Sequence, residues 1–429
     1  MDKTIKKFLE EHGFYIDLDL PTLTKAMLSD MRAGLSLKKS DEPMIRTYID
    51  PSQIEIREKS VIVIDAGGTN FRSALVKFSA DGSYSLSDFE KTKMPGIERE
   101  LSKKEFFAQI AKNIARFKDS CDEICFCFSY AMTITEDSDG ILDSFSKEVK
   151  APEVVGSKIG AELKIALGDA GWSKIPKVIL LNDTASALLS GTGNKKYSSY
   201  IGFILGTGMN AAFVQKASEE FNLAKTQIIV CESAKFSGFK NSDFDIILDE
   251  KSVNPGTNPF EKLCSGAYLG PLALETLKFA AKEEIFSPEF SKKILNRENL
   301  TLIEVSDFLE NSDENGKFSD MFDDEGANES DCENLFAIFD ALVARMAQLS
   351  AVILASCIIQ CGEGKSADSP ICVSCNGSSF FKTYKIIERT KKYLADTLNS
   401  LTGGKSPHYE ILPAEADITR GTAMAAMIQ

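Results

Sequence analysis

The segment Val61–Val76 constrains the fold most, because two apolar runs flank a polar turn that contains Gly67 and Gly68. The first run, Val61 to Ile64, is continuous and rich in β-branched residues, which is typical of a strand buried on both faces. The two glycines allow a tight turn that returns the chain as a second strand. The segment therefore predicts a β-hairpin within a buried sheet.

The turn of this hairpin has the composition of a phosphate-binding loop. Its backbone N–H groups can point at one anion, and Asp65 stands just before the glycines. A carboxylate beside a phosphate repels it unless a cation lies between them, so we expect Mg²⁺ near Asp65, bound directly or through water. On this segment alone, an ordinary hairpin with an aspartate before its glycines is the alternative.

The length and charge of the chain narrow the classes of function. A chain of 429 residues exceeds the size at which one hydrophobic core keeps growing, so we expect two domains with a cleft between them. The formal net charge of −14 argues against binding to a nucleic-acid backbone or to an anionic membrane. The N-terminal segment is charged and lacks the apolar core of a signal peptide, which predicts a cytoplasmic protein.

The cysteine and histidine content excludes further classes of chemistry. The ten cysteines are scattered and often lie in apolar runs, which indicates reduced core residues. Cys372 and Cys375 form the one CxxC pair, and with two histidines in the whole chain we expect no zinc site. The same shortage of histidine assigns general base catalysis to a carboxylate.

The first part of the chain predicts a specific order of elements. Residues 4–37 have helical periodicity interrupted at Pro21, and a strand is expected over Tyr84–Lys93 after the first hairpin. A helix over Lys103–Lys118 and a strand over Glu123–Ser129 follow. Three antiparallel strands, a helix and a parallel strand are the beginning of a ribonuclease-H-like fold.

A second hairpin suggests a second, related half. We expect a helix over Ala151–Ala170 and a buried strand over Val178–Asp183, after which Tyr200–Val214 repeats the design of the first hairpin. Further on, the acidic segment Glu310–Glu333 predicts a solvated surface loop. Phe336–Ile359 is strongly apolar but interrupted by polar residues, which indicates a buried core helix rather than a membrane span.

Three motifs carry a resemblance to a known family. Asp65–Arg72 resembles the first phosphate motif of the eukaryotic-type hexokinase family, Leu181–Thr184 resembles its catalytic-base segment, and Gly206–Asn210 resembles its second phosphate motif. Other segments match in the order of the family: Met31–Leu35, Met44–Tyr48, Asn254–Gly256, Phe260–Lys262, Ser265–Gly266, and Asp331–Cys332 with Arg345. The chain therefore looks like a divergent member of this family.

The resemblance implies an α/β protein with two ribonuclease-H-like (actin-like ATPase) domains flanking a cleft. The small domain is expected over residues 52–183 plus 416–429, and the large domain over residues 1–51 plus 184–415. The implied activity is ATP-dependent phosphorylation of the 6-hydroxyl of a hexose, with glucose expected, as a step that feeds glycolysis. Sugar binding should close the cleft, because an open site with bound ATP would hydrolyse it.

The resemblance also assigns roles to individual residues. Asp183 is the expected base that accepts the proton of the attacking hydroxyl, and Lys147 should reach the reacting edge of the sugar. From the residues alone, Asp183 is equally a helix-capping aspartate. The implied sugar contacts are Ser129, Ser146, Lys147, Asn182, Asp183, Asn210, Glu232, Asn258 and Glu261. The implied ATP contacts are Asp65, Gly67, Gly68, Thr69, Asn70, Arg72, Gly206, Thr207, Gly208, Gly377 and Ser378, with Mg²⁺ held near Asp65.

The chain departs from the family pattern in places that affect sugar preference. Phe128–Ala131 replaces Phe-Ser-Phe-Pro, Phe145–Lys147 replaces Trp-Thr-Lys, and Val230–Ala234 replaces Asn-Thr-Glu-Trp-Gly. Without the proline the sugar loop is expected to be less rigid. The adenosine segments Asn376–Ser378 and Ile418–Gly421 also differ from the family.

Three alternatives to this activity stay open. A kinase with narrow specificity for mannose or fructose fits the altered sugar loop. A catalytically silent hexokinase-like sugar sensor has no physical need for Asp65, Asp183, Lys147 and both glycine turns together. An actin-like ATPase shares the phosphate hairpins but does not need the sugar-binding set.

Overall fold

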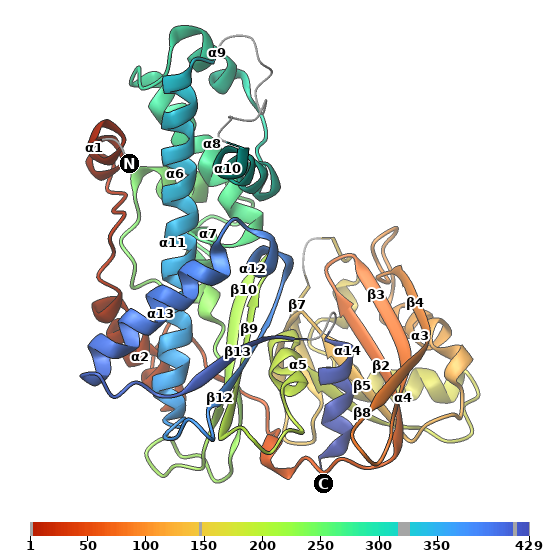
Figure 1. The fold of residues 1–429 in the computed structure, drawn as a ribbon. Helices are drawn as coiled ribbons and strands as arrows, with labels where there is room; N and C mark the ends of the chain where they lie inside the picture. Colours follow the sequence, from red (N-terminus) through yellow and green to blue (C-terminus); the bar gives the residue numbers. More distant parts are fainter. Residues whose placement is uncertain (1–2, 146–147, 316–326, 415–417, 429) are drawn as a thin grey trace.

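The computed structural model describes residues 3–145, 148–315, 327–414 and 418–428 (Figure 1). The described residues contain a five-stranded sheet and a six-stranded sheet, which lie in separate lobes. They also contain a two-stranded sheet. The predicted sugar residues Ser146 and Lys147 and the start of the predicted C-terminal segment at residue 416 lie outside the described residues.

The five-stranded sheet contains the first predicted hairpin. Its strand order is β4-β3-β2-β5-β8, in which β2, β3 and β4 are antiparallel and β5 and β8 run parallel to β2. The strands are β2 (Lys59–Gly67), β3 (Asn70–Phe78), β4 (Tyr84–Lys93), β5 (Glu123–Phe128) and β8 (Lys177–Leu181). The predicted order of three strands, a helix and a parallel strand is confirmed.

Two helices cover the outer face of this sheet. Apolar side chains of α3 (Lys103–Asn113) and α4 (Ile159–Asp169) pack on those of β2 and β5 in one hydrophobic cluster. The helix predicted over Ala151–Ala170 is wrong in its first part, because a short 3₁₀ turn, Pro152–Val154, precedes a left-handed glycine, Gly156, with φ of +81°. Glycine in this conformation ends a turn, so the helix begins at Ile159.

The six-stranded sheet contains the second predicted hairpin. Its order is β1-β11-β10-β9-β12-β13, in which β9 and β10 form the antiparallel hairpin and β12 runs parallel to β9 and β13. The strands are β1 (Ile45–Arg46), β9 (Ser199–Leu205), β10 (Met209–Gln215), β11 (Gln227–Val230), β12 (Ile371–Asn376) and β13 (Tyr409–Pro413). Cys372 and Cys375 are buried and free on β12, as predicted for core residues.

Helices form most of the rest of this lobe (Figure 1). They are α1 (Lys3–Glu11), α2 (Leu20–Leu35), α6 (Asp243–Lys251), α7 (Pro259–Lys262), α8 (Gly266–Lys282), α9 (Pro288–Asn296), α10 (Leu302–Asn315), α11 (Glu329–Cys361), α12 (Ser378–Lys382) and α13 (Ile386–Thr402). The predicted helical character of residues 4–37 is confirmed, but the interruption covers residues 12–19, and Pro21 lies in the first turn of α2, where its missing N–H costs nothing.

Helix α11 is the predicted core helix. Among the described residues it is long and apolar enough to cross a membrane, but 94% of its most apolar window is buried inside the protein. The predicted acidic surface loop Glu310–Glu333 is wrong at both ends, because α10 continues to Asn315 and α11 starts at Glu329. The side chain of Asn328 caps α11 and accepts from the N–H of Asp331, which explains why an acidic segment begins a helix.

A layer of two helices separates the sheets (Figure 1). Helices α5 (Asp183–Ser190) and α14 (Thr419–Met424) share one hydrophobic cluster with strands of both sheets. A Cβ added to Gly421 would lie 1.9 Å from the carbonyl oxygen of Ser186, so the two helices pack at a distance that only glycine allows. The predicted domain limits, 52–183 with 416–429 and 1–51 with 184–415, stay a prediction.

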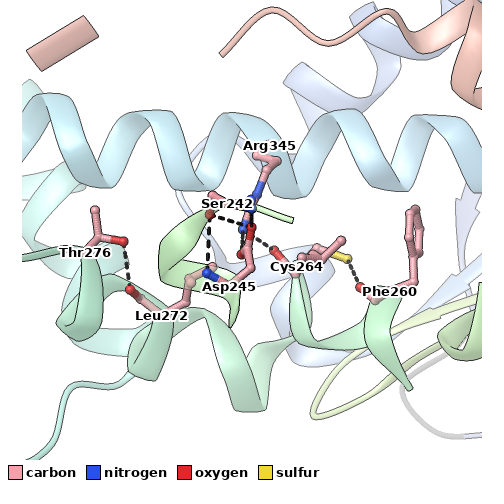
Figure 2. Close-up of polar contacts among 8 residues, drawn as sticks. Ser242, Asp245, Phe260, Cys264, Leu272, Thr276 and Arg345 are labelled. Carbon is pink, nitrogen blue, oxygen red and sulfur yellow. Dashed lines mark hydrogen bonds and ion pairs between the residues drawn. The ribbon is translucent and has the colours of Figure 1, made fainter. Parts of the chain in front are cut away.

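A buried ion pair holds α11 to the helices beneath it (Figure 2). Arg345 and Asp245 have side chains that are each 2% exposed and form two hydrogen bonds, of 2.9 and 2.7 Å. Asp245 also accepts from Ser242, and Arg345 donates to the carbonyl of Leu263 at 3.3 Å. Leu263 follows α7, so this pair fixes the segment that carries the predicted sugar residue Glu261.

Replacing Arg345 by Met is expected to lower the free energy of unfolding by roughly 3–5 kcal/mol, because it leaves the carboxylate of Asp245 buried without its partner. Lys6→Ala is the control, since Lys6 forms an exposed pair with Glu10 at 3.7 Å and its loss should cost less than about 1 kcal/mol. Urea unfolding followed by far-UV circular dichroism measures both. Equal costs for the two variants would contradict the structural role of the pair.

Candidate active site

A cleft of about 280 Å³ lies between the two sheets. The end of β8, the loop after β5 and the β6–β7 hairpin (Ala131–Ile134 and Gly140–Ser144) line one side, and the second hairpin with the segments after β11 and before α7 lines the other. All seven described residues of the predicted sugar set line this cleft: Ser129, Asn182, Asp183, Asn210, Glu232, Asn258 and Glu261. Residues far apart in the sequence are thus brought to one cavity.

Asp183 is positioned by the junction between a strand and a helix. The apolar strand β8 ends at Leu181, Asn182 caps α5, and Asp183 is the first residue of that helix. The backbone N–H of Thr184 donates to Asn182 Oδ1 at 2.8 Å and to Asp183 Oδ1 at 2.7 Å. Asn182 is therefore the N-cap of α5. The alternative, in which Asp183 caps the helix, is correct only in that Asp183 accepts from the same N–H group as Asn182.

Burial raises the pKa of Asp183 to about 6. The hydrogen bonds from Thr184 act in the opposite direction, and the negative charges of Glu232 and Asp65 raise the pKa further. A carboxylate with this pKa is ionised at neutral pH and is a stronger base than an exposed aspartate. Asp183 therefore has the protonation behaviour of a general base.

Two more carboxylates line the opposite wall of the cleft, Glu232 just after β11 and Glu261 in α7. Glu232 accepts a hydrogen bond of 3.0 Å from Asn210 Nδ2, and Glu261 accepts one of 3.1 Å from the backbone N–H of Met209. Burial raises the pKa of Glu261. A Cβ on Gly208 would lie 2.5 Å from Glu261 Oε2, so the second hairpin needs glycine there to let this carboxylate approach.

Asp65 stands at the end of the first hairpin strand, close enough to Asp183 for its charge to raise the pKa of Asp183. Gly68 has φ of +56°, which makes the turn tight, and Asp65 is 7% exposed. Arg72 lies opposite Asp65 in the strand register, and its Nη1 contacts Asp65 Oδ2 at 2.6 Å. Of the remaining predicted residues, Thr69 lies in the turn and Asn70 is the first residue of β3.

The oxygen ligands at this turn fit Mg²⁺ only if the ion is bound through water. No group of three or more metal-ligating side chains occurs in the part of the chain that the structure describes. Mg²⁺ keeps several waters and uses one or two carboxylates together with substrate phosphates, so the single carboxylate of Asp65 is sufficient for a water-mediated site.

The second turn is fixed by neighbouring glycines. Gly206 N–H donates to Gly208 O at 2.9 Å, so the N–H groups of Thr207 and Gly208 are the donors left for a ligand. The carbonyl of Gly206 accepts from Gly266 N and from Ser379 Oγ. Gly377 has φ of +109° and approaches Leu205 so closely that an added Cβ would lie 2.3 Å from its carbonyl oxygen. The predicted adenosine residues Gly377 and Ser378 therefore lie beside the second turn.

Three residues with ionisable side chains line the cleft but were not predicted as site residues: Tyr130, Asp143 and Lys235. Lys235 Nζ lies 3.9 Å from Glu232 Oε2, one helical turn away. Each of the three lies within three residues of a predicted site residue or motif. Their position beside a motif was the one sequence signal for these residues. It does not show which neighbours of a motif have side chains that face the cavity.

Comparison with known proteins identifies the family. A family model described as hexokinase matches residues 200–428, and a second model with the same description matches residues 5–192. The chain belongs to the hexokinase family. Membership makes it a kinase of the hexokinase type that uses ATP to phosphorylate a hexose.

Individual relatives cover nearly the whole chain. Hexokinase-1 of Schizosaccharomyces pombe is 26% identical, over 100% of this chain and 92% of the relative. Glucokinase-1 of Kluyveromyces lactis is 28% identical, over 83% of this chain and 84% of the relative. A hexokinase structure from Schistosoma mansoni, complexed with glucose, has a TM-score of 0.80 and 21% identity, over 99% of this chain and 98% of that chain. The predicted fold class of this hexokinase-family chain is thereby confirmed.

The raised pKa of Asp183 predicts that Asp183→Asn stabilises the protein at high pH. The pKa is about 6 in the folded chain against 3.8 as the ordinary value, so folding disfavours the ionised form. This destabilisation is absent when the pH lies below the ordinary pKa of 3.8, grows as the pH rises towards 6, and is complete when the pH lies above 6. We expect the variant to gain on the order of 1–3 kcal/mol at pH 8 and nothing near pH 3.5.

Asp119→Asn is the control of opposite sign. Burial acts to raise the pKa of Asp119, but hydrogen bonds from Ser173 and Lys174 outweigh it and lower the pKa. Folding therefore favours this ionised carboxylate, and its variant should be less stable than the wild type at pH 8. Thermal unfolding midpoints at both pH values measure the two variants. A less stable Asp183→Asn protein at pH 8 would contradict the assigned environment.

Proposed function

We propose that the chain transfers the γ-phosphoryl group of ATP to the 6-hydroxyl of glucose. The observation that carries this proposal is the position of Asp183, which lines the cleft together with Glu232 from the other wall and whose pKa is raised by burial first and then by the charges of Glu232 and of Asp65 at the first phosphate turn. A base in this place lies between a predicted phosphate site and a set of sugar-binding side chains. Glucose is the proposed sugar because one relative is named glucokinase and one similar structure is a glucose complex.

The sugar is held by a mixture of acceptors and donors. An ionised carboxylate can only accept hydrogen bonds, so Asp183, Glu232 and Glu261 accept hydrogen bonds from sugar hydroxyls. Side-chain amides and hydroxyls both donate and accept, and Ser129, Asn182, Asn210 and Asn258 supply them along the same walls. Ser146 and Lys147 complete the set in the proposal, with Lys147 at the reacting edge.

The chemical step needs a proton acceptor at the attacking hydroxyl. The carboxylate of Asp183 accepts the proton of the 6-hydroxyl as that oxygen forms its bond to the γ-phosphorus and the bond from phosphorus to the ADP oxygen breaks. Because Asp183 Oδ1 already accepts from the N–H of Thr184, the orientation of the carboxylate is fixed before the sugar binds. Fixed orientation lowers the entropic cost of reaching the transition state.

The two glycine turns bind the nucleotide. Backbone N–H groups of Gly67, Gly68, Thr69 and Asn70 on one side, and of Thr207 and Gly208 on the other, donate to the phosphates, while Gly377 and Ser378 contact the adenosine end. Mg²⁺ held through water by Asp65 would neutralise the charge of the phosphates during transfer. Arg72 holds Asp65 in place from the neighbouring strand.

Closure of the lobes completes the proposal. The α5–α14 layer joins the sheets, and the cleft residues come from both lobes, so a bound sugar draws the walls together and excludes water from the phosphate. We place the product in glycolysis. The cytoplasmic location stays a prediction.

The proposal is tested by measuring ADP release with a panel of sugars. Glucose should give the highest kcat/KM, and 6-deoxyglucose should give no release, because it lacks the accepting hydroxyl. Release with mannose or fructose alone would favour the narrow-specificity kinase, and equal release with 6-deoxyglucose would exclude the 6-hydroxyl as acceptor. Absence of release with every sugar would favour the silent sensor, and release without sugar would favour an ATPase.

A further inference from the structure

Tyr130 connects the sugar side of the cleft to the first phosphate turn. It is 7% exposed, lines the cleft next to Ser129, and its hydroxyl donates a hydrogen bond of 2.9 Å to the carbonyl oxygen of Gly68. Burial raises the pKa of Tyr130 well above its ordinary value, so the hydroxyl is protonated and acts as a donor. The accepting carbonyl belongs to the turn that is proposed to bind phosphate.

This hydrogen bond determines where a neighbouring N–H group points. The carbonyl of Gly68 and the N–H of Thr69 belong to one planar trans peptide, in which the two bonds point in opposite directions. When the carbonyl is held towards Tyr130, the N–H of Thr69 is directed away from it. Gly68 has φ of +56° and no Cβ to restrict it, so without the bond this peptide can rotate at little cost.

The ring of Tyr130 is itself held in place. Its centroid lies 4.7 Å from that of Phe128 and 5.1 Å from that of Phe145, both in tilted or edge-on contact. The N–H of Ser129 donates to the carbonyl of Ala66 at 2.9 Å, next to the same turn. The sugar loop and the phosphate turn therefore form one connected unit.

These contacts replace the restraint that the sequence lacks. The loop has Ala131 where a proline would restrict it, and Ala131 begins strand β6. Tyr130, which directly precedes Ala131, is held by its hydrogen bond to Gly68 and by ring contacts with Phe128 and Phe145. The loop is therefore restrained one residue before the position of the missing proline. The predicted loss of rigidity is thus offset by a side chain that also reaches the phosphate turn.

We propose that Tyr130 is a positioning residue that fixes the direction of the Thr69 N–H and so sets the affinity for the phosphates of ATP from the sugar side of the cleft. It acts through the Gly68–Thr69 peptide and contacts no phosphate itself. This inference rests on the proposed function, because the ligand of the first turn is the ATP of that reaction.

Tyr130→Phe removes one oxygen atom and keeps the ring. The variant should bind a non-hydrolysable ATP analogue about fivefold more weakly, as expected for the loss of one hydrogen bond, with the same rise in KM for ATP. KM for glucose should change by less than about twofold, because the lost bond orders the phosphate turn only. The thermal unfolding midpoint should fall by no more than a few degrees, because one hydrogen bond contributes about 1 kcal/mol to the free energy of unfolding.

Tyr197→Phe is the matched control, because its hydroxyl also donates one hydrogen bond, of 2.9 Å, to Glu410 and does not line the cleft. This variant should bind the analogue as the wild type does. Unchanged affinity in Tyr130→Phe, or an equal rise in KM for ATP and for glucose, would overturn the inference. The affinity for the analogue is measured at equilibrium without turnover. Failure of this inference can therefore be distinguished from failure of the proposed function, which is tested by ADP release.

Discussion

The site depends on the junction at which β8 ends and α5 begins. An apolar strand brings Asn182 and Asp183 to the edge of one sheet, and the N–H of Thr184 holds both side chains through two short hydrogen bonds. The helix that starts there packs against both sheets and against α14. One short segment therefore fixes the orientation of the proposed base and joins the lobes whose walls must meet around the sugar.

Negative charge is the second constraint on the cleft. Asp183, Glu232 and Glu261 line one cavity, and the negative charges of Glu232 and of nearby Asp65 add to burial in raising the pKa of Asp183. Each carboxylate is stabilised by a local donor: Asp65 by Arg72, Asp183 by the N–H of Thr184, Glu232 by Asn210 Nδ2 and Glu261 by the N–H of Met209. The same charge is the reason why the proposed phosphate site needs both backbone donors and a cation.

The local features of this structure could be predicted from the residues themselves, whereas the long-range ones followed from the resemblance or were missed. Both glycine hairpins and the core helix α11 follow from periodicity and turn chemistry, and the resemblance placed seven residues that meet in the cleft. The helix start at Ile159 and the helical ends of the acidic segment were missed, because a glycine turn and an asparagine cap decided them. The bond from Tyr130 to Gly68 joins residues distant in the chain and leaves no local signal.

The account rests on Asp183 as the base of phosphoryl transfer in a cleft that binds sugar independently of that role. Its most direct test measures glucose binding and turnover in Asp183→Asn, which keeps an acceptor for the N–H of Thr184 and removes the basic carboxylate. The account predicts that kcat falls by about 10²–10⁴-fold while glucose still binds to the variant. Turnover close to that of the wild type would contradict it.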